Sequence, residues 1–346
     1  MLPPWISYSS RSNKIKLIPW DSVFNLTSLS QHQSVMTMET FMKSEAGRVW
    51  PEGERTSLCY SGRPGAEENS CNAKHGSPFG PFWDSFQVSF DRSLMFSPLN
   101  FNTDPDNLRR WSERFPVSEY PVMAMTGAPA SFPVRRTDVH RQKYLAWTDQ
   151  WRARGQAWVT TNMGGGVGGS YIGLHLRWVL HLSLSPSLYT VILFSVRNGL
   201  DWSKACEHTE TVGLGNLFSS AQCLGYSNER GQLTRELCLP SEDTVIRQLK
   251  QTLTKTNIKH VFVASDNDHM IEKFDHVFSS EGVKFYKQSG TSDDGFLLDL
   301  VILSQSKHFL GNCVSSYSAF VKRARDVDSL QSEFWTFSLQ NIKTEL

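Results

Sequence analysis

The stretch YIGLHLR, residues 171–177, decides the fold that we expect for this chain. Its apolar residues predict a buried strand, and Arg177 places a fixed positive charge at the strand tip. Far downstream, the stretch GNCVSSY at 311–317 puts small hydroxyl residues where a helix is expected to begin. A helix N-terminus binds anions through its free N–H groups, and an arginine can grip two phosphate oxygens at once. Together the two segments predict a diphosphate held between two parts of one fold.

Strand and helix patterns alternate through the second half of the chain. The expected strands are 171–177, 260–266, 283–286 and 308–311. The expected helices are 245–253, 271–278, 296–304 and 315–325. This alternation predicts an α/β fold with a parallel sheet covered by helices on both faces. Ligands of such sheets bind beyond the carboxyl ends of the strands, where Arg177 and the start of the last helix would lie.

The composition is that of a globular protein. Of 346 residues, 39% are hydrophobic and 20% are charged. The formal net charge is +1, so we expect no general attraction for nucleic acid or for an acidic membrane.

The segment 162–170 contains five glycines and is the expected domain boundary. In the first half, helical spacing predicts a helix at 142–151, and the Pro- and Gly-rich stretch at 76–84 predicts a rigid loop.

The chain has six cysteines, and none of them lies in a C-x-x-C pair or at zinc-ligand spacing. An even number predicts three disulfides and an oxidising compartment, the alternative being six buried free thiols. Spacing alone leaves all pairings open. Asn25 begins the one N-x-S/T sequon of the sequence and is a candidate glycosylation site.

The two ends of the chain carry different signals. The last four residues, KTEL at 343–346, differ at one position from the K-D-E-L signal for retention in the endoplasmic reticulum. The first residues, MLPPW at 1–5, show neither the basic nor the apolar region of a signal peptide. We therefore expect a protein of the endoplasmic reticulum lumen whose signal peptide and true beginning precede residue 1.

Residues 178–196 form a run of nineteen residues without a charge. By length such a run can span a bilayer. It contains Pro186 and four serines, however, and it interrupts the step from a strand to a loop. We expect an insertion at about 178–198 rather than a membrane span.

Three motifs resemble the family of GDP-fucose protein O-fucosyltransferases that modify EGF-like repeats. They are PFGPFWD at 78–84, GLHLR at 173–177, and FLGNCVSS at 309–316, which continues to AFVKR at 319–323. The resemblance extends from LPPWI at 2–6 to the C-terminal tail. Two features depart from the family pattern. The family's early Gly-Arg-Phe-Gly-Asn-Gln loop is absent, and about twenty residues separate the GLHLR motif from the GLDW turn at 199–202.

The resemblance implies a GT-B fold, in which two Rossmann-like domains face each other across a cleft. Residues 1–165 would form the acceptor-side domain, lacking its first strand and its Gly-rich loop. Residues 170–330 would bind GDP-fucose, and residues 331–346 would be a tail. The implied reaction is an inverting transfer of fucose to Ser or Thr hydroxyls of folded EGF-like repeats, as in Notch, by a peptide O-fucosyltransferase without an essential cofactor or metal. The alternative is an inactive relative that binds such repeats and assists their folding.

Arg177 is the first candidate for catalysis, because negative charge develops on the β-phosphate as GDP departs. The alternative is a structural salt bridge at a strand end. His175 lies on the same face of the strand; the resemblance implies that it contacts the nucleotide, whereas a buried core histidine is the alternative. Leu176 faces the other side and would contribute only backbone groups.

Ser315, Ser316 and Tyr317 open the last helix, where they would hold phosphate oxygens or simply cap the helix. The family often has Phe at the position of Tyr317. Asp299 lies in an apolar helix, and the resemblance assigns it to the nucleotide, since a carboxylate matches the two N–H donors of guanine. A helix-surface carboxylate is the alternative.

The remaining candidates are weaker. Asp201 would orient the arginine or the acceptor hydroxyl, and Asp266 is a further acidic candidate. Phe82 and Trp83 would shape the acceptor groove or pack a structural loop. The family pattern also implies three disulfides, Cys59–Cys71, Cys206–Cys238 and Cys223–Cys313.

Overall fold

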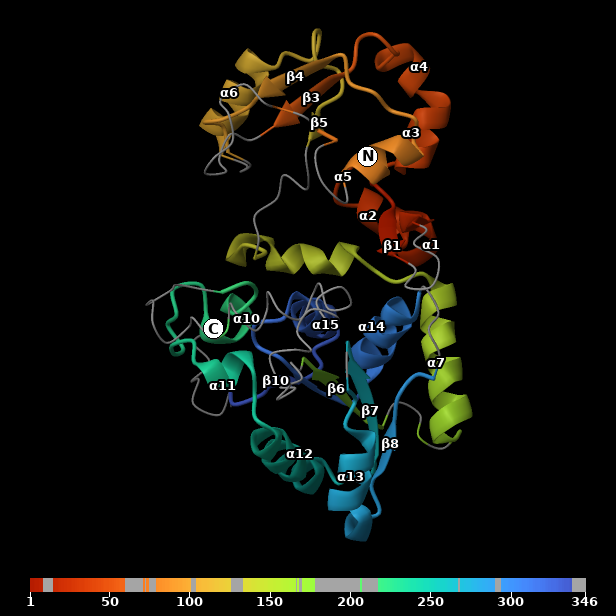
Figure 1. Cartoon of the computed structure of the whole chain (residues 1–346), viewed down its shortest axis with the longest axis vertical. Helices are drawn as coiled ribbons and strands as arrows, with labels where there is room; N and C mark the ends of the chain where they lie inside the picture. The colour runs from red at the N-terminus through yellow and green to blue at the C-terminus, as the bar shows by residue number, and fades with distance from the viewer. Residues whose placement is uncertain are drawn as a thin grey trace, which may run out of the picture. The chain divides into compact units, whose positions relative to one another are not determined.

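The computed structural model describes residues 1–8, 15–59, 71, 73–74, 79–100, 104–125, 133–165, 167, 170–177, 206, 217–266, 268–289 and 294–337. The chain forms two compact units, Met1–Ser131 and Phe132–Leu346. The division falls before the glycine-rich segment at 162–170, where a boundary was expected. The reason is that helix α7 (Asp149–Met163) packs on helix α14 (Gly295–Gln305) and so belongs to the second unit (Figure 1).

The second unit is built on a five-stranded parallel sheet. Its strands are β6 (Ile172–Leu176), β7 (His260–Ser265), β8 (Lys284–Tyr286), β9 (His308–Gly311) and β10 (Ser332–Phe334). They lie in the order β10-β9-β6-β7-β8, and all neighbours are parallel. The chain moves outward from β6 to β8 and then returns to β9 on the other side. Between β6 and β9 the winding therefore reverses, which is where doubly wound sheets bind ligands.

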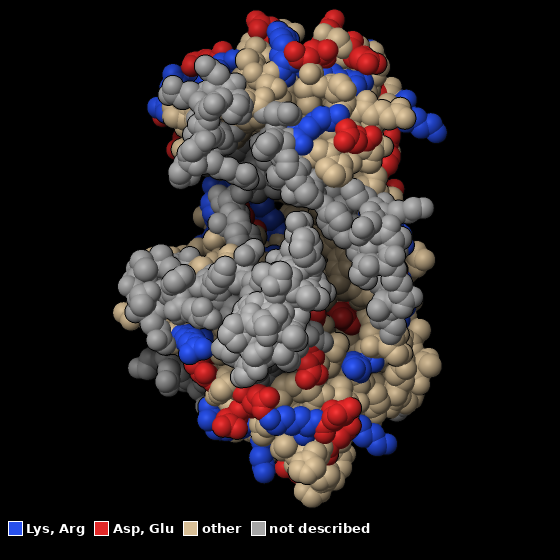
Figure 2. Space-filling view, in the orientation of Figure 1, with Lys and Arg blue, Asp and Glu red and all other residues tan. Residues whose placement is uncertain are grey.

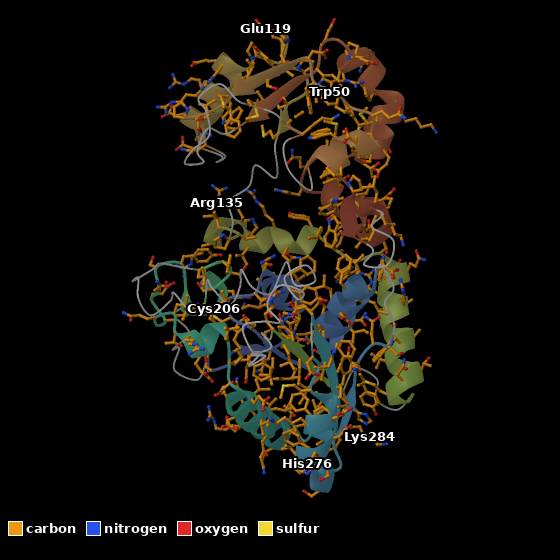
Figure 3. The ribbon with its side chains drawn as sticks, viewed as in Figure 1. Trp50, Glu119, Arg135, Cys206, His276 and Lys284 are labelled. Carbon is orange, nitrogen blue, oxygen red and sulfur yellow. A yellow bond between two sulfur atoms is a disulfide. The ribbon has the colours of Figure 1, made fainter. Side chains whose placement is uncertain are left out.

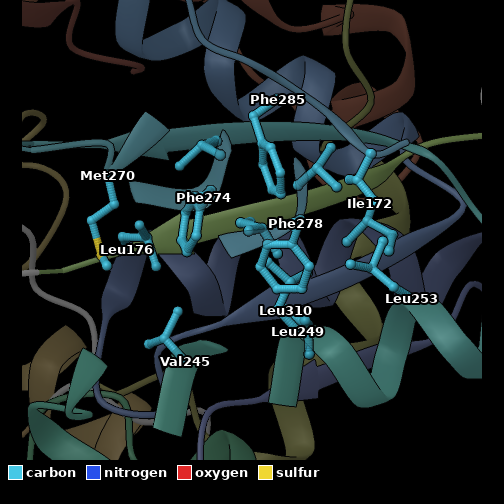
Figure 4. Close-up of a cluster of buried hydrophobic side chains, with 14 of the residues drawn as sticks. Ile172, Leu176, Val245, Leu249, Leu253, Met270, Phe274, Phe278, Phe285 and Leu310 are labelled. Carbon is cyan, nitrogen blue, oxygen red and sulfur yellow. The ribbon is translucent and has the colours of Figure 1, made fainter. Parts of the chain in front are cut away.

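One face of this sheet is covered by α12 (Glu242–Thr256) and α13 (Ile271–Val277). Successive strand residues point to opposite faces, so Ile172 and Leu176 share one face. They join a buried apolar cluster with Val245, Leu249 and Phe274. Figure 4 shows aromatic rings gathered at the centre of this cluster. Each fully buried aliphatic or aromatic side chain contributes roughly 1.5–3 kcal/mol, so this face is a main source of stability.

The other face is covered by α7, α14 and α15 (Ser316–Val327). The ring of Trp158 on α7 meets that of Phe262 on β7 edge-on, with centroids 5.1 Å apart. Gly173 allows α14 to approach β6 closely. A Cβ atom at this position would lie 2.9 Å from Ser306 Oγ and 3.0 Å from Leu303 Cδ2. Helices therefore lie on both faces, and the expected layered α/β arrangement is confirmed.

Two expectations about this unit are wrong. Residues 332–334, expected to lie in a tail, form β10 and pair with β9. The tail is held further by Trp335, which is fully buried and donates from Nε1 to the carbonyl of His175 at 3.1 Å. The helix expected at 142–151 is also divided: a 3-10 helix, η1 (Arg136–Tyr144), ends before α7 begins. Thr148 caps α7, which explains the break.

The first unit contains a three-stranded parallel sheet and a separate hairpin. The sheet has the order β4-β3-β5, with β3 (Thr56–Cys59), β4 (Arg92–Met95) and β5 (Ala124–Met125). The hairpin pairs β1 (Trp5–Tyr8) with β2 (Ile15–Ile18). The helices are α1 (Trp20–Val23), α2 (Leu26–Ser30), α3 (Met38–Ser44), α4 (Ala46–Val49), α5 (Phe79–Ser85) and α6 (Pro105–Arg114). Asn25 is exposed and caps α2 through Oδ1, which leaves the amide nitrogen outside this bond.

Helix α5 replaces the rigid loop that was expected at 76–84. Its Pro81 lies in the first turn, where the missing N–H costs no intrahelical hydrogen bond. Trp83 is only 7% exposed and belongs to a core cluster with Trp50. Phe82 packs against it with ring centroids 4.9 Å apart. These positions favour the packing role of both rings over a role in an acceptor groove.

Three disulfides join the cysteines in the pairs that the family resemblance implied: Cys59–Cys71, Cys206–Cys238 and Cys223–Cys313. Cys206 lies beside α10 (Ala221–Leu224) and α11 (Arg235–Cys238), as Figure 3 shows.

In the part of the chain that the structure describes, no helix is long and apolar enough to cross a membrane. Residues 178–196 lie outside that part. Acidic and basic side chains are interspersed on the face of each unit seen in Figure 2.

Candidate active site

The candidate site lies at the carboxyl edge of the sheet, between β6 and β9. In the register of these strands, Leu174 pairs with Leu310. Arg177 and Cys313 each come three residues later, so both segments leave the sheet at the same edge. Neighbouring strands lie about 4.8 Å apart. The strand tip with Arg177 and the loop that leads into α15 are therefore neighbours, as the sequence predicted.

Arg177 follows β6 directly and is paired with a carboxylate. Its Nη1 atom lies 3.0 Å from Oδ2 of Asp266, the residue after β7. The side chains are 23% and 39% exposed, so solvent reaches the pair. Burial raises the pKa of Asp266, and the positive charge of Arg177 opposes this shift. The guanidinium is thus held at the edge of the sheet by one carboxylate, within reach of solvent.

His175 is buried and connects β6 to α15. Its Nδ1 atom lies 2.7 Å from Oγ of Ser318. Its ring is tilted by 35° against the ring of Tyr317, with centroids 4.7 Å apart. Burial, and next the positive charge of Arg177, lower the pKa of His175 to about 3. The imidazole is therefore neutral near pH 7 and serves as a hydrogen-bonding group, not as a cation.

The N-terminus of α15 faces the same edge. Ser315 is its N-cap, and the Ser315 side chain accepts a hydrogen bond from the N–H of Ser318 at 3.4 Å. Ser316 is exposed, whereas Ser315 is buried. Among the described residues, no acceptor is within hydrogen-bond reach of the Ser316 and Tyr317 N–H groups. A helix of twelve residues with free N–H groups at its start favours an anion.

The loop that leads into α15 is held by residues that the sequence motifs alone did not reveal. Asn312 is fully buried, and its Oδ1 accepts the N–H groups of Val314 and Ser315 at 3.0 and 3.1 Å. Gln222 donates from Nε2 to the carbonyls of Cys313 and Ser315 at 2.6 and 3.1 Å. The disulfide of Cys313 closes the loop onto α10. Asn312 lies within the FLGNCVSS motif, but its role in holding the loop was not predicted, and no sequence signal pointed to Gln222.

Tyr317 and Asp299 form the outer part of the site. The hydroxyl of Tyr317 donates to the carbonyl of Phe296 at 2.7 Å and so ties α15 to the start of α14. Burial, and next the nearby Asp299 carboxylate, raise the pKa of Tyr317. Asp299 accepts a hydrogen bond from Gln288 Nε2 at 2.5 Å. Burial raises the pKa of Asp299 to about 7, although this hydrogen bond opposes the shift.

The other predicted site residues are placed differently. Leu176 is buried in the apolar cluster on the opposite face, so only its backbone faces the edge. Asp201 lies outside the described residues. Phe82 and Trp83 belong to the core of the first unit. The described residues contain no group of three or more His, Cys, Asp or Glu side chains suited to a metal ion.

The arrangement can bind a diphosphate and stabilise charge that develops on it. A guanidinium, a helix N-terminus and a hydroxyl-rich loop meet at the switch point of a doubly wound sheet. Each of the two units contains a parallel sheet, which is the arrangement found in glycosyltransferases of the GT-B class. The GT-B expectation is confirmed by the solved structures that follow.

The sequence profile of the GDP-fucose protein O-fucosyltransferase family matches residues 1–179 and 190–328. GDP-fucose protein O-fucosyltransferase 1 of Caenorhabditis elegans is 32% identical over 333 residues, which cover 94% of this chain and 78% of the relative. The crystal structure of POFUT1 in its apo form matches with a TM-score of 0.83 and 31% identity, over 97% of this chain and 88% of that one. Its complex with GDP-fucose matches with a TM-score of 0.83 and 30% identity, over 98% and 89%.

This chain belongs to the GDP-fucose protein O-fucosyltransferase family. The resemblance stated from the three sequence motifs is thereby confirmed. The profile match is interrupted at 180–189, inside the uncharged segment where an insertion was expected.

Proposed function

We propose that this protein transfers fucose from GDP-fucose to a Ser or Thr hydroxyl of a folded EGF-like repeat, with inversion at the anomeric carbon. The observation that carries the proposal is that Arg177 and the loop into α15 leave the sheet at the same edge, at its switch point. Family membership supports GDP-fucose as the donor, since POFUT1 has been crystallised with it.

The bond between the fucose C1 atom and the β-phosphate oxygen breaks while the acceptor oxygen bonds to C1 from the opposite face, and the proton of the acceptor hydroxyl is released to solvent. Negative charge grows on the departing phosphate, and Arg177 stabilises it together with the N–H groups of Ser316 and Tyr317. Removing one such fixed donor typically costs about 10²–10³ in rate. His175 would contribute as a neutral hydrogen-bonding group because burial keeps it uncharged.

Asp299 would recognise the guanine base. Among the described residues, Gln288 is the donor to its carboxylate, and its raised pKa indicates that the ionised form needs more donors. Two adjacent N–H groups of guanine would supply these donors, whereas adenine offers no such pair. Tyr317 lies between His175 and Asp299 and would provide a ring surface for the nucleotide.

The acceptor and the compartment form a further part of the proposal. Three disulfides support an oxidising compartment, and together with the KTEL ending they suggest the endoplasmic reticulum lumen. Disulfide-containing EGF-like repeats, such as those of Notch, fold in the same compartment. We propose that the first unit contributes to acceptor binding and that Asp201 orients the arginine or the acceptor hydroxyl.

A second candidate is an inactive relative that binds EGF-like repeats and assists their folding. The ion pair between Arg177 and Asp266 favours this alternative, because a guanidinium engaged by a carboxylate must be released or shared when it binds phosphate. In that case the protein would bind folded repeats without transferring fucose.

Two measurements test the proposal. Saturating GDP should raise the thermal midpoint by several degrees, because ligand at 100 times its dissociation constant adds about 2.7 kcal/mol; ADP and UDP at the same concentration should not. Fucose transfer is then measured with a folded EGF-like repeat and, as control, with the same repeat reduced and alkylated. Transfer to the folded repeat alone supports the proposal. GDP binding and repeat binding without transfer would favour the inactive relative, and no response to GDP would overturn the donor site.

A further inference from the structure

A cavity of about 260 Å³ lies within the second unit, where Gln222 connects its lining to the loop that leads into α15. It is open to solvent on one side and is lined by η1, by the segment around α10, and by the second and third turns of α15. Its volume suits one small organic molecule. The polar side chains that matter most are Arg136, Gln222, Tyr226, Arg230, Lys322 and Arg323.

The lining carries an excess of positive charge. Four cationic side chains face two carboxylates, Glu229 and Asp326. Asp326 is already bound by Lys322, with Nζ and Oδ2 2.6 Å apart. Glu229 lies 4.0 Å from Nη1 of Arg136, an exposed and weak pair. Two carboxylates against four cations still leave an excess of two positive charges in the lining.

Arg323 forms no salt bridge among the described residues, although the nearby charge of Asp326 favours its protonated form. Its Nε donates to Oε1 of Gln142 at 3.2 Å, which fixes the plane of the guanidinium. Burial lowers the pKa of Arg323, and the nearby Tyr226 and Asp326 oppose this shift. Among the described residues, no acceptor bonds to its two terminal nitrogens. A partly desolvated guanidinium with two free donor groups matches a phosphate or a carboxylate.

Gln222 supplies the complementary feature, an acceptor without a donor. Its amide nitrogen is committed to the carbonyls of Cys313 and Ser315, so the oxygen must point the other way. That oxygen, Oε1, is buried and has no hydrogen-bond partner in the described structure. A buried acceptor left unpaired costs about 1–3 kcal/mol. Because Gln222 lines the cavity, a small shift of its amide would let a ligand hydroxyl bond to this oxygen and remove the cost.

We propose that this cavity binds a small hydroxylated anion, a sugar phosphate or a sugar acid. Its acidic group contacts the terminal nitrogens of Arg323, with Arg136 and Arg230 at the rim, and one hydroxyl donates to Oε1 of Gln222. The site is separate from the proposed donor site. Arg323 follows the N-cap Ser315 by eight residues, which is roughly 12 Å along the helix axis.

Calorimetric titration with four probes tests the site: glucose 6-phosphate, glucuronate, inorganic phosphate and neutral glucose. The titrations use wild-type protein saturated with GDP and also Arg177→Ala protein, so that binding at the proposed donor site does not contribute to the signal. A failure of the proposed donor site would therefore be distinguished from a failure of this cavity to bind its ligand. We expect saturable binding of glucose 6-phosphate or glucuronate at one site per chain. The probe that binds more tightly shows whether the site prefers a phosphate or a carboxylate group. Inorganic phosphate should bind about tenfold more weakly, since it cannot place a ring hydroxyl at Gln222, and glucose should not bind.

Arg323→Met should weaken binding of the tighter probe by tenfold or more, and Arg230→Ala, at an exposed position, should weaken it by a smaller factor. Arg235→Ala, an exposed arginine outside the cavity lining, is the matched control and should bind as wild type does. The proposal is overturned if no anion binds saturably, or if Arg323→Met and Arg230→Ala both bind as tightly as the control. Equal affinity for inorganic phosphate and the sugar phosphate would contradict the proposal that a ligand hydroxyl donates to Gln222.

Discussion

The Nδ1 atom of His175 lies 2.7 Å from the Oγ atom of Ser318, so the central strand β6 is joined to helix α15 by a buried hydrogen bond. The same hydroxyl oxygen accepts the N–H of Asn312 at 2.9 Å. Arg177 lies two residues beyond His175, and the free N–H groups of α15 lie within one turn of Ser318. This contact therefore fixes the two anion-binding elements relative to each other before any ligand arrives, which is the preorganisation that electrostatic catalysis requires.

Arg177→Ala should lower the rate of fucose transfer by about 10²–10³, because one fixed positive charge at the developing phosphate is lost. Arg177→Lys should retain part of the activity, since an ammonium keeps the charge but cannot grip two oxygens. The rates are measured at saturating GDP-fucose with a folded EGF-like repeat. Arg235→Ala is the control for a lost surface arginine. If Arg177→Ala transferred fucose at the wild-type rate, the proposed catalytic role of Arg177 would be contradicted.

GDP binding should strengthen as the pH rises from about 5.5 to 8.5, because Asp299 has a pKa raised to about 7 and must be ionised to accept two N–H groups. Below this pKa, affinity should change by up to about tenfold per pH unit. His175, with its pKa lowered to about 3, stays neutral throughout this range. Asp299→Asn should bind GDP weakly and without this dependence. A flat pH profile for the wild-type protein would contradict the role of Asp299.

The same carboxyl group should affect the stability of the ligand-free protein in the opposite direction. The native state holds the Asp299 proton more tightly than the unfolded chain, whose ordinary value is 3.8. Between this value and about 7, the contribution of Asp299 to the free energy of unfolding therefore falls as the pH rises. Denaturation of wild type and Asp299→Asn across this range measures the difference, which should grow with pH.

Gly173→Ala should destabilise the protein by roughly 1–3 kcal/mol, because the added Cβ meets Ser306 and Leu303 of the closely packed α14. Gly47→Ala is the matched control: nothing lies within 4 Å of its added Cβ, and an exposed helical alanine is favoured over glycine by about 0.5–1 kcal/mol. Thermal midpoints of the two variants should move in opposite directions. A Gly173→Ala midpoint at or above that of wild type would show that α14 can move away from β6.

Arg325→Met should destabilise the second unit by about 3 kcal/mol or more. The Arg325 side chain is fully buried and donates to the carbonyls of Ser304 and Gln331 at 3.2 and 2.6 Å, and also to that of Ser306. It thereby satisfies carbonyls at the end of α14, which would otherwise be buried without donors. Denaturant unfolding measures the loss, and Arg235→Met, at an exposed site, should change stability by less than about 0.5 kcal/mol. Similar midpoints for the two variants would contradict this role.

Local sequence patterns predicted much of the second unit. The strand at 308–311 has the bounds expected from its apolar run, and the helix expected at 296–304 extends by only one residue at each end. These segments are apolar and bounded by polar residues or glycine, so their periodicity is clear. The helix expected at 142–151 was wrong because the spacing of its apolar residues continues across a break that Thr148 creates by capping.

Contacts between distant segments were harder to predict. Gln222 holds the carbonyls before α15 from a position about ninety residues earlier in the chain, and its sequence surroundings give no sign of this. Trp335 lies in what was read as a tail, yet it bonds to the backbone of His175 in the central strand. Such contacts depend on how the strands are ordered in the sheet, which no local pattern encodes.

By itself, the sequence determined the family, the alternation of strands and helices, and the residues that carry charge and hydroxyl groups at strand ends, because these follow from motifs and from short-range periodicity. Only the tertiary structure decided that Arg177 is paired with Asp266, that His175 is neutral and bonded to Ser318, and that a cavity with an unpaired Gln222 oxygen lies along α15. Charge state and pairing depend on burial and on neighbours brought together from distant parts of the chain, and these are fixed only when the sheet is assembled.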